Sequence, residues 1–350
     1  MTAGRVPDLD EELRRRLGRR FGDAVEVWLD ALPPVLSDLA ERWKLELGSL
    51  IQRGSVSVVI RCRTAEGRAA VLKVSPERRR VIDEAAALAR WRTAHVPAVL
   101  AVDERVGALL IEAIEPGTPL SDSAAYPSIK SVASLLTSLH GNGAPDPGYP
   151  PVAARIEYLF ESSRKLYERQ PSLVALISRE LYERSRELAL RLAAELSATA
   201  LLHGDLTPMN VLDGGKERGL VAIDPAPCLG DPAFDAIDLL LWRAKDPETI
   251  AARAELLAPA IGAEPGRLFD WCTAFAGMAA LEIAEAAGSS PEPVAPLIAL
   301  ASRVESDGTR AGRRALPRRE PLAVCQSAQG PSRLSGSETK ATAVHVGVCL

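Results

Sequence analysis

The stretch that decides the fold reads HGDLTPMNVL (residues 203–212), and a short loop separates it from LVAIDP (residues 220–225). Both segments contain short apolar runs bounded by turn-forming residues, which is the pattern of short strands. The loop between them is rich in glycine, so the two runs can pair as a hairpin. Such a hairpin would bring Asn210 close to Asp224. Together with Asp205, these side chains are expected to converge on one site.

This spacing suits phosphoryl transfer, which depends on positioning and charge neutralisation more than on covalent chemistry. Asp205 is expected to orient the acceptor hydroxyl and finally to take its proton. Asn210 and Asp224 offer hard oxygen ligands, which suit a Mg²⁺ ion that also holds phosphate and water. A purely structural interpretation, in which Asp205 and Asn210 cap a loop, is weaker because of the His-Gly prefix and the strand before Asp224.

The motif H-G-D-x-x-x-x-N, followed by an aspartate that closes a short strand, resembles the aminoglycoside phosphotransferase family, and protein kinases share the arrangement. The resemblance covers about residues 25–305 and leans toward the branch of streptomycin 6-phosphotransferases and hydroxyurea phosphotransferases. The cues for this branch are AIDPAP (residues 222–227), Gly230-Asp231-Pro232 and a helical segment around Trp28. The resemblance implies an α+β, protein-kinase-like two-lobe fold, with a small antiparallel-sheet N-lobe that carries one main helix and a mostly helical C-lobe.

The resemblance also implies an ATP-dependent phosphotransferase that moves the γ-phosphate to a hydroxyl of an aminoglycoside-type antibiotic. Streptomycin, phosphorylated at its 6-hydroxyl, is the expected substrate, and resistance is the expected result. ATP and Mg²⁺ are the expected cofactors. Two alternatives stay open: a kinase for hydroxyurea or another small hydroxylated metabolite, and a nucleotide-binding pseudokinase with a regulatory role. The intact Asp205, Asn210 and Asp224 count against the pseudokinase.

The nucleotide side of the site is expected in the first part of the chain. Lys73 lies in an apolar strand and would place its ammonium on the α- and β-phosphates, as the family's strand lysine does. Glu84, on the following helix, is the favoured partner of Lys73. Asp83 and Glu77 compete for that role.

Two further nucleotide contacts are expected from the main chain. Residues 53–58 occupy the position of the phosphate-covering loop, but they lack the G-x-G-x-x-G pattern, so only the amides of Gly54 and Ser55 are candidates. The backbones of Glu112 and Ile114, where the lobes should meet, are candidates for the adenine edge.

The acceptor side is marked by three candidate residues. Glu282 and Glu285 lie three residues apart on one helical face and would attract a cationic substrate, although a solvated helix face explains them equally well. Trp271 is a candidate platform for a sugar ring. Its four-residue spacing from Phe275 is, however, typical of a packed core.

Three residues are expected to support the loop that carries Asp205. His203 is interpreted as a supporting side chain and not as a proton shuttle. Asp231 precedes Pro232, as an N-cap precedes a proline at the first helical position. Asp235 is expected to brace the loop.

Three parts follow one another along the chain. Residues 1–115 are expected to form the nucleotide-binding lobe, with a helical extension over residues 9–48 that Pro33-Pro34 divides in two. Residues 116–306 are expected to form the catalytic and substrate-binding lobe. Residues 307–350 are rich in Gly, Ser and Pro without an amphipathic period, which predicts a flexible tail.

The bulk composition narrows the class of protein. The 350 residues are 47% hydrophobic and 25% charged, as in ordinary globular proteins. A net charge of -4 provides no basic field, so nucleic acid is not an expected partner. The chain has no apolar run of membrane-spanning length, no signal-peptide pattern at its N-terminus and five scattered cysteines without a C-x-x-C pair. We therefore expect a cytoplasmic enzyme that acts on a small molecule and has no membrane partner.

Overall fold

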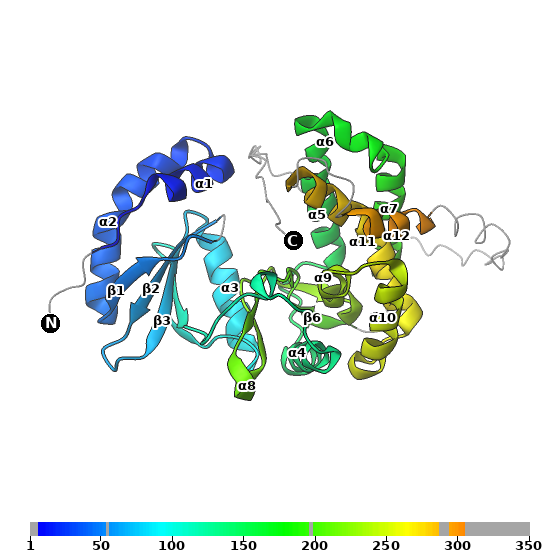
Figure 1. The fold of residues 1–350 in the computed structure, drawn as a ribbon. Helices are drawn as coiled ribbons and strands as arrows, with labels where there is room; N and C mark the ends of the chain where they lie inside the picture. The colour runs from blue at the N-terminus through cyan, green and yellow to red at the C-terminus, as the bar shows by residue number, and fades with distance from the viewer. Residues whose placement is uncertain (1–5, 54–55, 196–198, 287–293, 305–350) are drawn as a thin grey trace, which may run out of the picture.

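The computed structural model describes residues 6–53, 56–195, 199–286 and 294–304. It has two lobes, with the N-terminal lobe on the left and the C-terminal lobe on the right of Figure 1. This arrangement is the predicted two-lobe α+β fold. The tail predicted for residues 307–350 lies outside the described residues, as do Gly54 and Ser55.

The N-terminal lobe is a small antiparallel sheet with helices on both faces. Its elements are α1 (Glu11–Phe21), α2 (Ala24–Trp43), β1 (Glu46–Leu50), β2 (Val58–Arg63), β3 (Ala69–Val74), α3 (Arg78–Arg90), β4 (Val99–Asp103) and β5 (Ala108–Glu112). The strand order is β1-β2-β3-β5-β4, and each neighbouring pair is antiparallel. The small antiparallel sheet that the resemblance implies for this lobe is therefore confirmed.

The two faces of this sheet meet different partners because side chains alternate along a strand. On β5, Leu110 packs in one core with α1 and α2, whereas Leu109 and Ile111 pack in a second core with α3 and the C-terminal lobe. On β3, Leu72 belongs to the first core. The neighbouring Lys73 therefore faces the side on which α3 and the C-terminal lobe lie.

The helical extension divides at a different place from the predicted one. α1 ends at Gly22, whose φ of 69° lies in the left-handed region. Pro33 and Pro34 lie inside α2, so the prediction that they divide the segment is wrong. The helix continues because tertiary packing of its apolar face outweighs the cost of the prolines. That face is formed by the buried residues Val25, Leu29, Leu32, Leu36 and Leu39.

The C-terminal lobe is mostly helical and carries two short two-stranded sheets. Its elements are η1 (Leu120–Asp122), α4 (Ile129–Asn142), α5 (Val152–Arg164), α6 (Leu166–Arg169), η2 (Pro171–Ala175), α7 (Arg179–Ala194), β6 (Ala200–Leu202), β7 (Val211–Asp213), α8 (Gly215–Arg218), β8 (Leu220–Ala222), β9 (Cys228–Gly230), η3 (Pro232–Ala236), α9 (Ile237–Leu241), α10 (Pro247–Ile261), α11 (Pro265–Ala286) and α12 (Ala295–Ala301). β6 pairs with β9, and β7 pairs with β8. The second pair is the hairpin predicted from the sequence.

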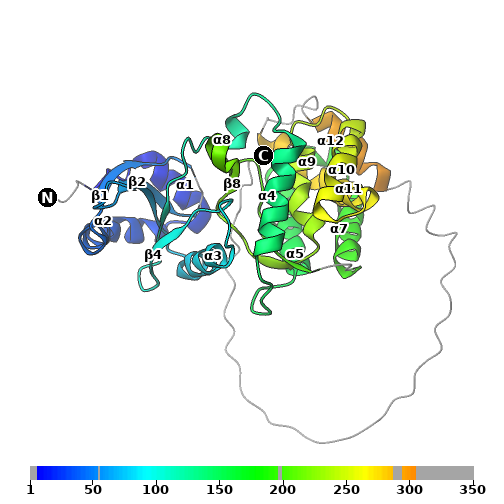
Figure 2. The same ribbon diagram turned by 90° about the horizontal axis from the view of Figure 1, so that it is seen from below.

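Helix α3 belongs to both lobes. It lies between the sheet and the helices of the C-terminal lobe in Figures 1 and 2. Its buried residues Val81, Ala85 and Leu88 are part of the large core of the C-terminal lobe. A second connection is the ion pair between Arg218 of α8 and Glu112 of β5, at 2.7 Å. We propose that the lobes divide after residue 115, where the chain has left β5.

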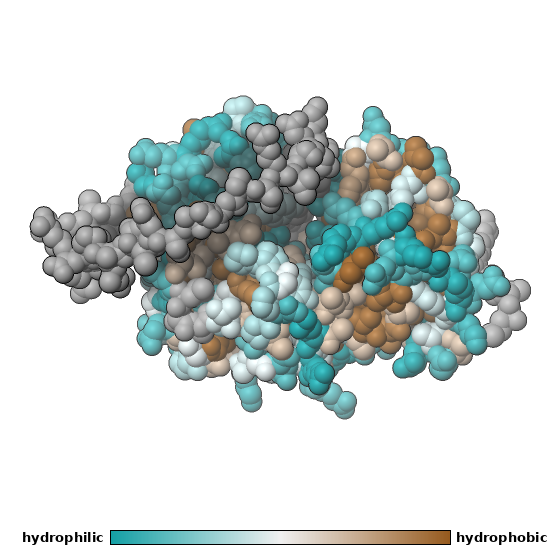
Figure 3. Space-filling view, turned by 180° about the vertical axis from the view of Figure 1, so that it is seen from behind, coloured by the Kyte–Doolittle hydropathy of each residue, from teal (hydrophilic) through white to brown (hydrophobic). Residues whose placement is uncertain are grey.

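Seen from behind, apolar residues reach the surface over the N-terminal lobe in patches bordered by hydrophilic residues (Figure 3). Within the described ranges, no helix combines the length and the apolar character that crossing a membrane requires.

Candidate active site

The loop of residues 203–210, here called the HGD loop, joins β6 to β7. Hydrogen bonds to buried side chains hold it in place. The buried Asp235 of η3 accepts hydrogen bonds from the amides of His203 (2.8 Å) and Gly204 (2.9 Å). His203 donates from Nε2 to Ile223 O (3.0 Å) and accepts at Nδ1 from the Asp205 amide (3.4 Å). Burial lowers the pKa of His203, which favours the neutral ring that these bonds require. Both side chains lie where the sequence predicts loop supports.

Gly204 explains the glycine of the H-G-D motif. Its φ is 74°, a conformation that side chains with a Cβ rarely adopt. A Cβ at this position would lie 2.1 Å from Ala226 O, so the loop passes too close to the neighbouring backbone for any other residue.

The three oxygen-bearing side chains predicted from the sequence come together at this loop. Asn210 donates from Nδ2 to Asp205 O (2.9 Å) and to Asp205 Oδ2 (3.2 Å). The Ile223 amide donates to Asn210 O (2.8 Å), so the β7–β8 hairpin extends to the residue before Asp224. Asp224 itself has a left-handed φ of 58°, which turns the chain away from the hairpin at that point.

Lys73 joins the two lobes through an ion cluster. Its Nζ lies 2.6 Å from Glu84 Oε1 on α3 and 2.6 Å from Asp224 Oδ1 after β8. Burial disfavours the ammonium, but the Asp224 and Glu84 carboxylates outweigh it and raise the pKa of Lys73. Burial also opposes the ionisation of Asp224, yet Lys73 holds its pKa below the ordinary value, whereas burial raises the pKa of Glu84. These ion pairs connect the N-terminal lobe to Asp224 of the C-terminal lobe.

Glu84 is the partner of Lys73 among the three candidates. Asp83 pairs instead with Arg79, one turn earlier on α3, at 2.9 Å. The Glu77 carboxylate lies 3.6 Å from Arg20 of α1. Glu84 alone of the three is buried, on the helical face that meets the sheet.

The two adenine-edge candidates lie at the last residue of β5 and two residues beyond it, and their amides differ in their hydrogen bonds. The Glu112 amide already donates to Ala98 O (2.9 Å), and its carboxylate binds Arg218. The N–H of Glu112 is therefore already engaged in the sheet, and a contact of the Glu112 backbone with the adenine edge stays a prediction. Among the residues that the structure describes, the buried Ile114 amide has no hydrogen-bond partner.

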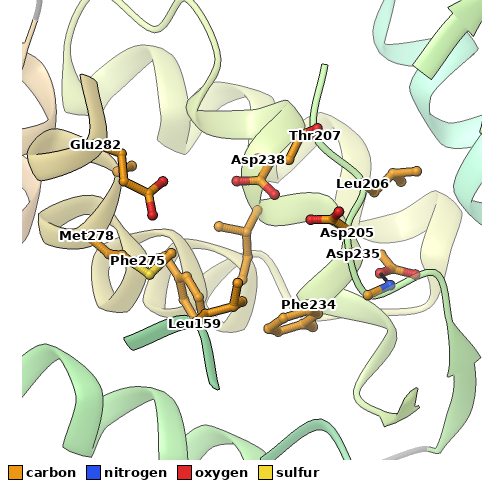
Figure 4. A pocket seen from close by; sticks show the side chains of 13 residues that line it. Leu159, Asp205, Leu206, Thr207, Phe234, Asp235, Asp238, Phe275, Met278 and Glu282 are labelled. Carbon is orange, nitrogen blue, oxygen red and sulfur yellow. Dashed lines mark hydrogen bonds between the residues drawn. The ribbon is translucent and has the colours of Figure 1, made fainter. Parts of the chain in front are cut away.

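A cavity of about 30 Å³ adjoins the HGD loop, and its lining includes four carboxylate residues, one of which is the loop support Asp235. Figure 4 shows Asp205, Asp238 of α9 and Glu282 of α11 with their carboxylates turned toward the same space. Apolar side chains, among them Leu159, Phe275 and Met278, form the rest of the wall. The cavity has room for one or two water molecules or for a small polar group.

Burial and neighbouring carboxylates raise the pKa values of two carboxyl groups in this cavity. Burial and the nearby Asp205 carboxylate raise the pKa of Asp238 to about 7. Burial, Asp238 and Asp205 raise the pKa of Glu282 to about 8, and Arg155 opposes the shift in both. Near neutral pH the cavity therefore holds both negative charge and exchangeable protons.

Of the three predicted acceptor residues, the structure brings only Glu282 to the HGD loop. Glu285 lies outside the cavity, 3.6 Å from Arg169. Trp271 is fully buried and donates from Nε1 to Asp231 Oδ2 (2.8 Å), so the prediction of a sugar platform is wrong. Its spacing from Phe275 reflects core packing. Asp231 is the N-cap of η3, as its position before a proline predicts, and it accepts from the Ala233 amide.

Sequence reasoning missed two residues of the site. Arg155 of α5 donates to Gly204 O (2.8 Å) and to Asp205 Oδ1 (3.0 Å), although it lies fifty positions earlier in the chain. No local pattern marks it. Asp238 follows Asp235 by three residues, a helical spacing that could have placed it beside the HGD loop.

The residues at this site fit a magnesium ion held largely by a nucleotide. Within the described part of the chain, no group of three or more His, Cys, Asp or Glu side chains could hold a metal by itself. Asn210 and Asp224 offer one amide and one carboxylate oxygen. This donor set suits Mg²⁺, which takes its other ligands from phosphate and water.

Comparison with solved structures identifies the fold. The choline kinase LicA of Streptococcus pneumoniae has a TM-score of 0.52 at 14% identity and covers 80% of this chain and 99% of its own. A second structure of LicA, in complex with AMP, has a TM-score of 0.53. The chain therefore has the protein-kinase-like fold.

Comparison of sequences identifies the family. The model of the aminoglycoside/hydroxyurea antibiotic resistance kinases matches residues 42–287, and the chain belongs to this family. Streptomycin 6-kinase of Streptomyces glaucescens is 26% identical, over 87% of this chain and 99% of that protein. Hydroxyurea phosphotransferase of Kitasatospora aureofaciens is 29% identical, over 77% of this chain and 78% of that protein. The resemblance stated from the HGD motif is confirmed.

Proposed function

We propose that this chain transfers the γ-phosphate of ATP to a hydroxyl of a cationic aminoglycoside, with the 6-hydroxyl of streptomycin as the first candidate, and so confers resistance. The observation that carries the proposal is the cavity in which the Asp238 and Glu282 carboxylates face Asp205. The similarity to streptomycin 6-kinase over nearly that protein's whole length supports it.

The nucleotide is bound between the lobes. Lys73, held by Glu84, contacts the α- and β-phosphates, and the Ile114 backbone receives the adenine edge. Asn210 and Asp224 would hold Mg²⁺, which would neutralise charge on the phosphates. Lys73, whose Nζ contacts both Glu84 and Asp224, would be held in place by Glu84.

Asp205 serves the acceptor. It accepts a hydrogen bond from the substrate hydroxyl and orients the oxygen in line with the γ-phosphorus. As the new P–O bond forms, the bond to the β-phosphate oxygen breaks, ADP leaves with that electron pair, and the hydroxyl proton passes to Asp205.

The acidic cavity favours a cationic acceptor over a neutral one. Asp238 and Glu282 form no ion pair with another residue of the described ranges, so they can receive a positive group of the substrate. Because the cavity is small, such a group enters it while the remainder of an aminoglycoside lies outside. A neutral acceptor such as hydroxyurea gains nothing from this charge and is the second candidate, since one relative is a hydroxyurea phosphotransferase.

The test is a panel assay of ADP release with streptomycin, other aminoglycosides, hydroxyurea and amino alcohols. We expect streptomycin to stimulate turnover most, with product mass increased by one phosphate. Stimulation by hydroxyurea alone would replace the proposed substrate, and nucleotide binding without any turnover would support a pseudokinase.

The matched variant is Asp205→Ala. We expect transfer to fall by at least about a thousandfold while ATP binding, measured by calorimetry, stays within about twofold of the parent. Near-parental turnover in this variant would remove the role proposed for Asp205.

A further inference from the structure

Arg155 is a basic residue that contacts the proposed catalytic carboxylate of Asp205. It comes from α5, and its side chain is 11% exposed. One guanidinium contacts two consecutive residues of the HGD loop, with Nε on the Gly204 carbonyl (2.8 Å) and Nη2 on Asp205 Oδ1 (3.0 Å). A planar, forked donor can hold both acceptors at fixed angles.

The Asp205 carboxylate is held from both sides. Arg155 binds Oδ1, and Asn210 donates to Oδ2 at 3.2 Å. Each carboxylate oxygen can accept more than one hydrogen bond, so these contacts leave room for a substrate hydroxyl. Without Arg155, the carboxylate could rotate about its Cβ–Cγ bond, because only the longer contact with Asn210 would remain.

The negative charge of the cavity is a second reason to assign Arg155 a role at Asp205. Asp205, Asp238 and Glu282 share one cavity, and like charges placed together repel. Within the described residues, Arg155 is the basic side chain that forms an ion pair with any of the three. Its contact is directed to Asp205, so the carboxylate that meets the substrate hydroxyl is the one given a fixed counter-ion.

We propose that Arg155 is a positioning residue of the transfer reaction, which acts through Asp205 by fixing the plane and the position of its carboxylate. The inference rests on the role proposed for Asp205. It predicts that Arg155 affects the rate of transfer and leaves nucleotide binding unchanged, because Arg155 lies on the acceptor side and Lys73 on the nucleotide side.

The experiment compares Arg155→Gln and Arg155→Lys with the control Arg186→Gln. Arg186 of α7 forms a comparable ion pair with Glu157, which lies on α5 two positions after Arg155, but this pair is at the surface. Turnover is measured as ADP release, with streptomycin and with water as acceptor. Melting temperature and ATP affinity are measured for every variant.

We expect Arg155→Gln to lower kcat by about a hundredfold, the size of effect that misplacement of a catalytic group produces. The KM for ATP should stay within about twofold, and Arg155→Lys should recover part of kcat because it keeps the charge but not the fork. Arg186→Gln should behave as the parent.

Two results would overturn the inference. One is a kcat of Arg155→Gln close to that of the parent. The other is a loss in which KM for ATP rises as much as kcat falls and Arg155→Lys is no better, since a general structural role produces that pattern. If Arg155→Gln does not fold, Arg155→Lys decides by its kcat alone. Asp205→Asn, assayed in parallel, separates the two proposals: activity in that variant would refute the role of Asp205 itself.

Discussion

Two carboxyl groups, Asp238 and Glu282, set the chemistry of the acceptor side at the scale of single residues. Their pKa values of about 7 and about 8 arise chiefly from burial, and the Asp205 carboxylate raises both further. A bound cation favours the ionised forms, so substrate binding would be accompanied by proton release near neutral pH.

The first prediction is therefore a pH dependence. As pH rises from about 6 to about 9, both groups lose their protons, attraction for a cation grows, and KM for streptomycin should fall. The guanidinium groups of streptomycin stay charged throughout, so the change reports on the enzyme. Glu282→Gln should weaken the fall and raise KM at pH 8.5 by about tenfold, as expected for one lost charge-assisted contact.

The control is Glu285→Gln, which makes the same change three residues further along α11, outside the cavity. Its pH profile should match that of the parent. Equal effects of the two variants would mean that the net charge of the helix, and not the cavity, governs affinity.

Those residues of the site that lie close together in the sequence could be predicted from it. Asp205, Asn210, Asp224 and Asp235 lie within 31 positions, and the turn and strand pattern brings them together. Lys73 was proposed from its place in an apolar strand and from the family's strand lysine, and Glu84 was the favoured of three candidate partners. Arg155 was not predictable, because its contact depends on how α5 packs against β9 and the HGD loop. Trp271 was misassigned because one spacing fits both a ligand platform and a core.

Helix α2 shows the limits of prediction at the scale of elements. Local propensity placed a break at Pro33-Pro34, yet the helix spans both prolines because its apolar face covers the sheet. The strands were predicted correctly, since their apolar runs are bounded by turns. Only packing partners, which a local pattern does not contain, decide whether a proline ends a helix.

The second prediction tests this packing. Leu29 is fully buried against the sheet, whereas Val27 on the same helix is 76% exposed. Leu29→Asp should destabilise the protein by at least about 3 kcal/mol, because it removes core packing and buries a charge. Val27→Asp should change stability by less than about 0.5 kcal/mol. Urea unfolding monitored by circular dichroism measures both.

A comparable loss in both variants would show that α2 tolerates no added charge at any position. An unchanged free energy of unfolding in Leu29→Asp would show that the packing of α2 against the sheet contributes little to stability. The match to the family begins at residue 42, so α1 and nearly all of α2 precede it, and this test asks whether they are part of the folded unit.

The whole molecule is organised around the contact of Lys73 with Asp224 across the lobes. The contact engages Oδ1, one of the two carboxylate oxygens of Asp224, the residue proposed as a metal ligand. Helix α3 makes the link stiff, because it packs in the core of the C-terminal lobe while its Glu84 holds Lys73.

The third prediction concerns Asp224 as a ligand of the proposed magnesium ion. The parent should bind ATP at least about tenfold more tightly with Mg²⁺ than with chelator, and Asp224→Asn should lose most of that difference because it removes a ligand charge. Calorimetric titration with and without Mg²⁺ measures it. Asp213→Asn, at an exposed position on β7, is the control and should keep the parental difference. An unchanged magnesium effect in Asp224→Asn would exclude Asp224 as a ligand.

Much of the wall of the acidic cavity comes from helices, whereas the groups proposed to handle the phosphate come from loops. Leu159, Asp238, Met278 and Glu282 stand on α5, α9 and α11, whereas Asp205, Asn210 and Asp224 stand on loops around a hairpin. If this cavity recognises the acceptor, as we propose, substitutions in the three helices would change which acceptor is bound while the loops keep the transfer reaction. Acceptor range could then diverge in evolution without a change in catalysis.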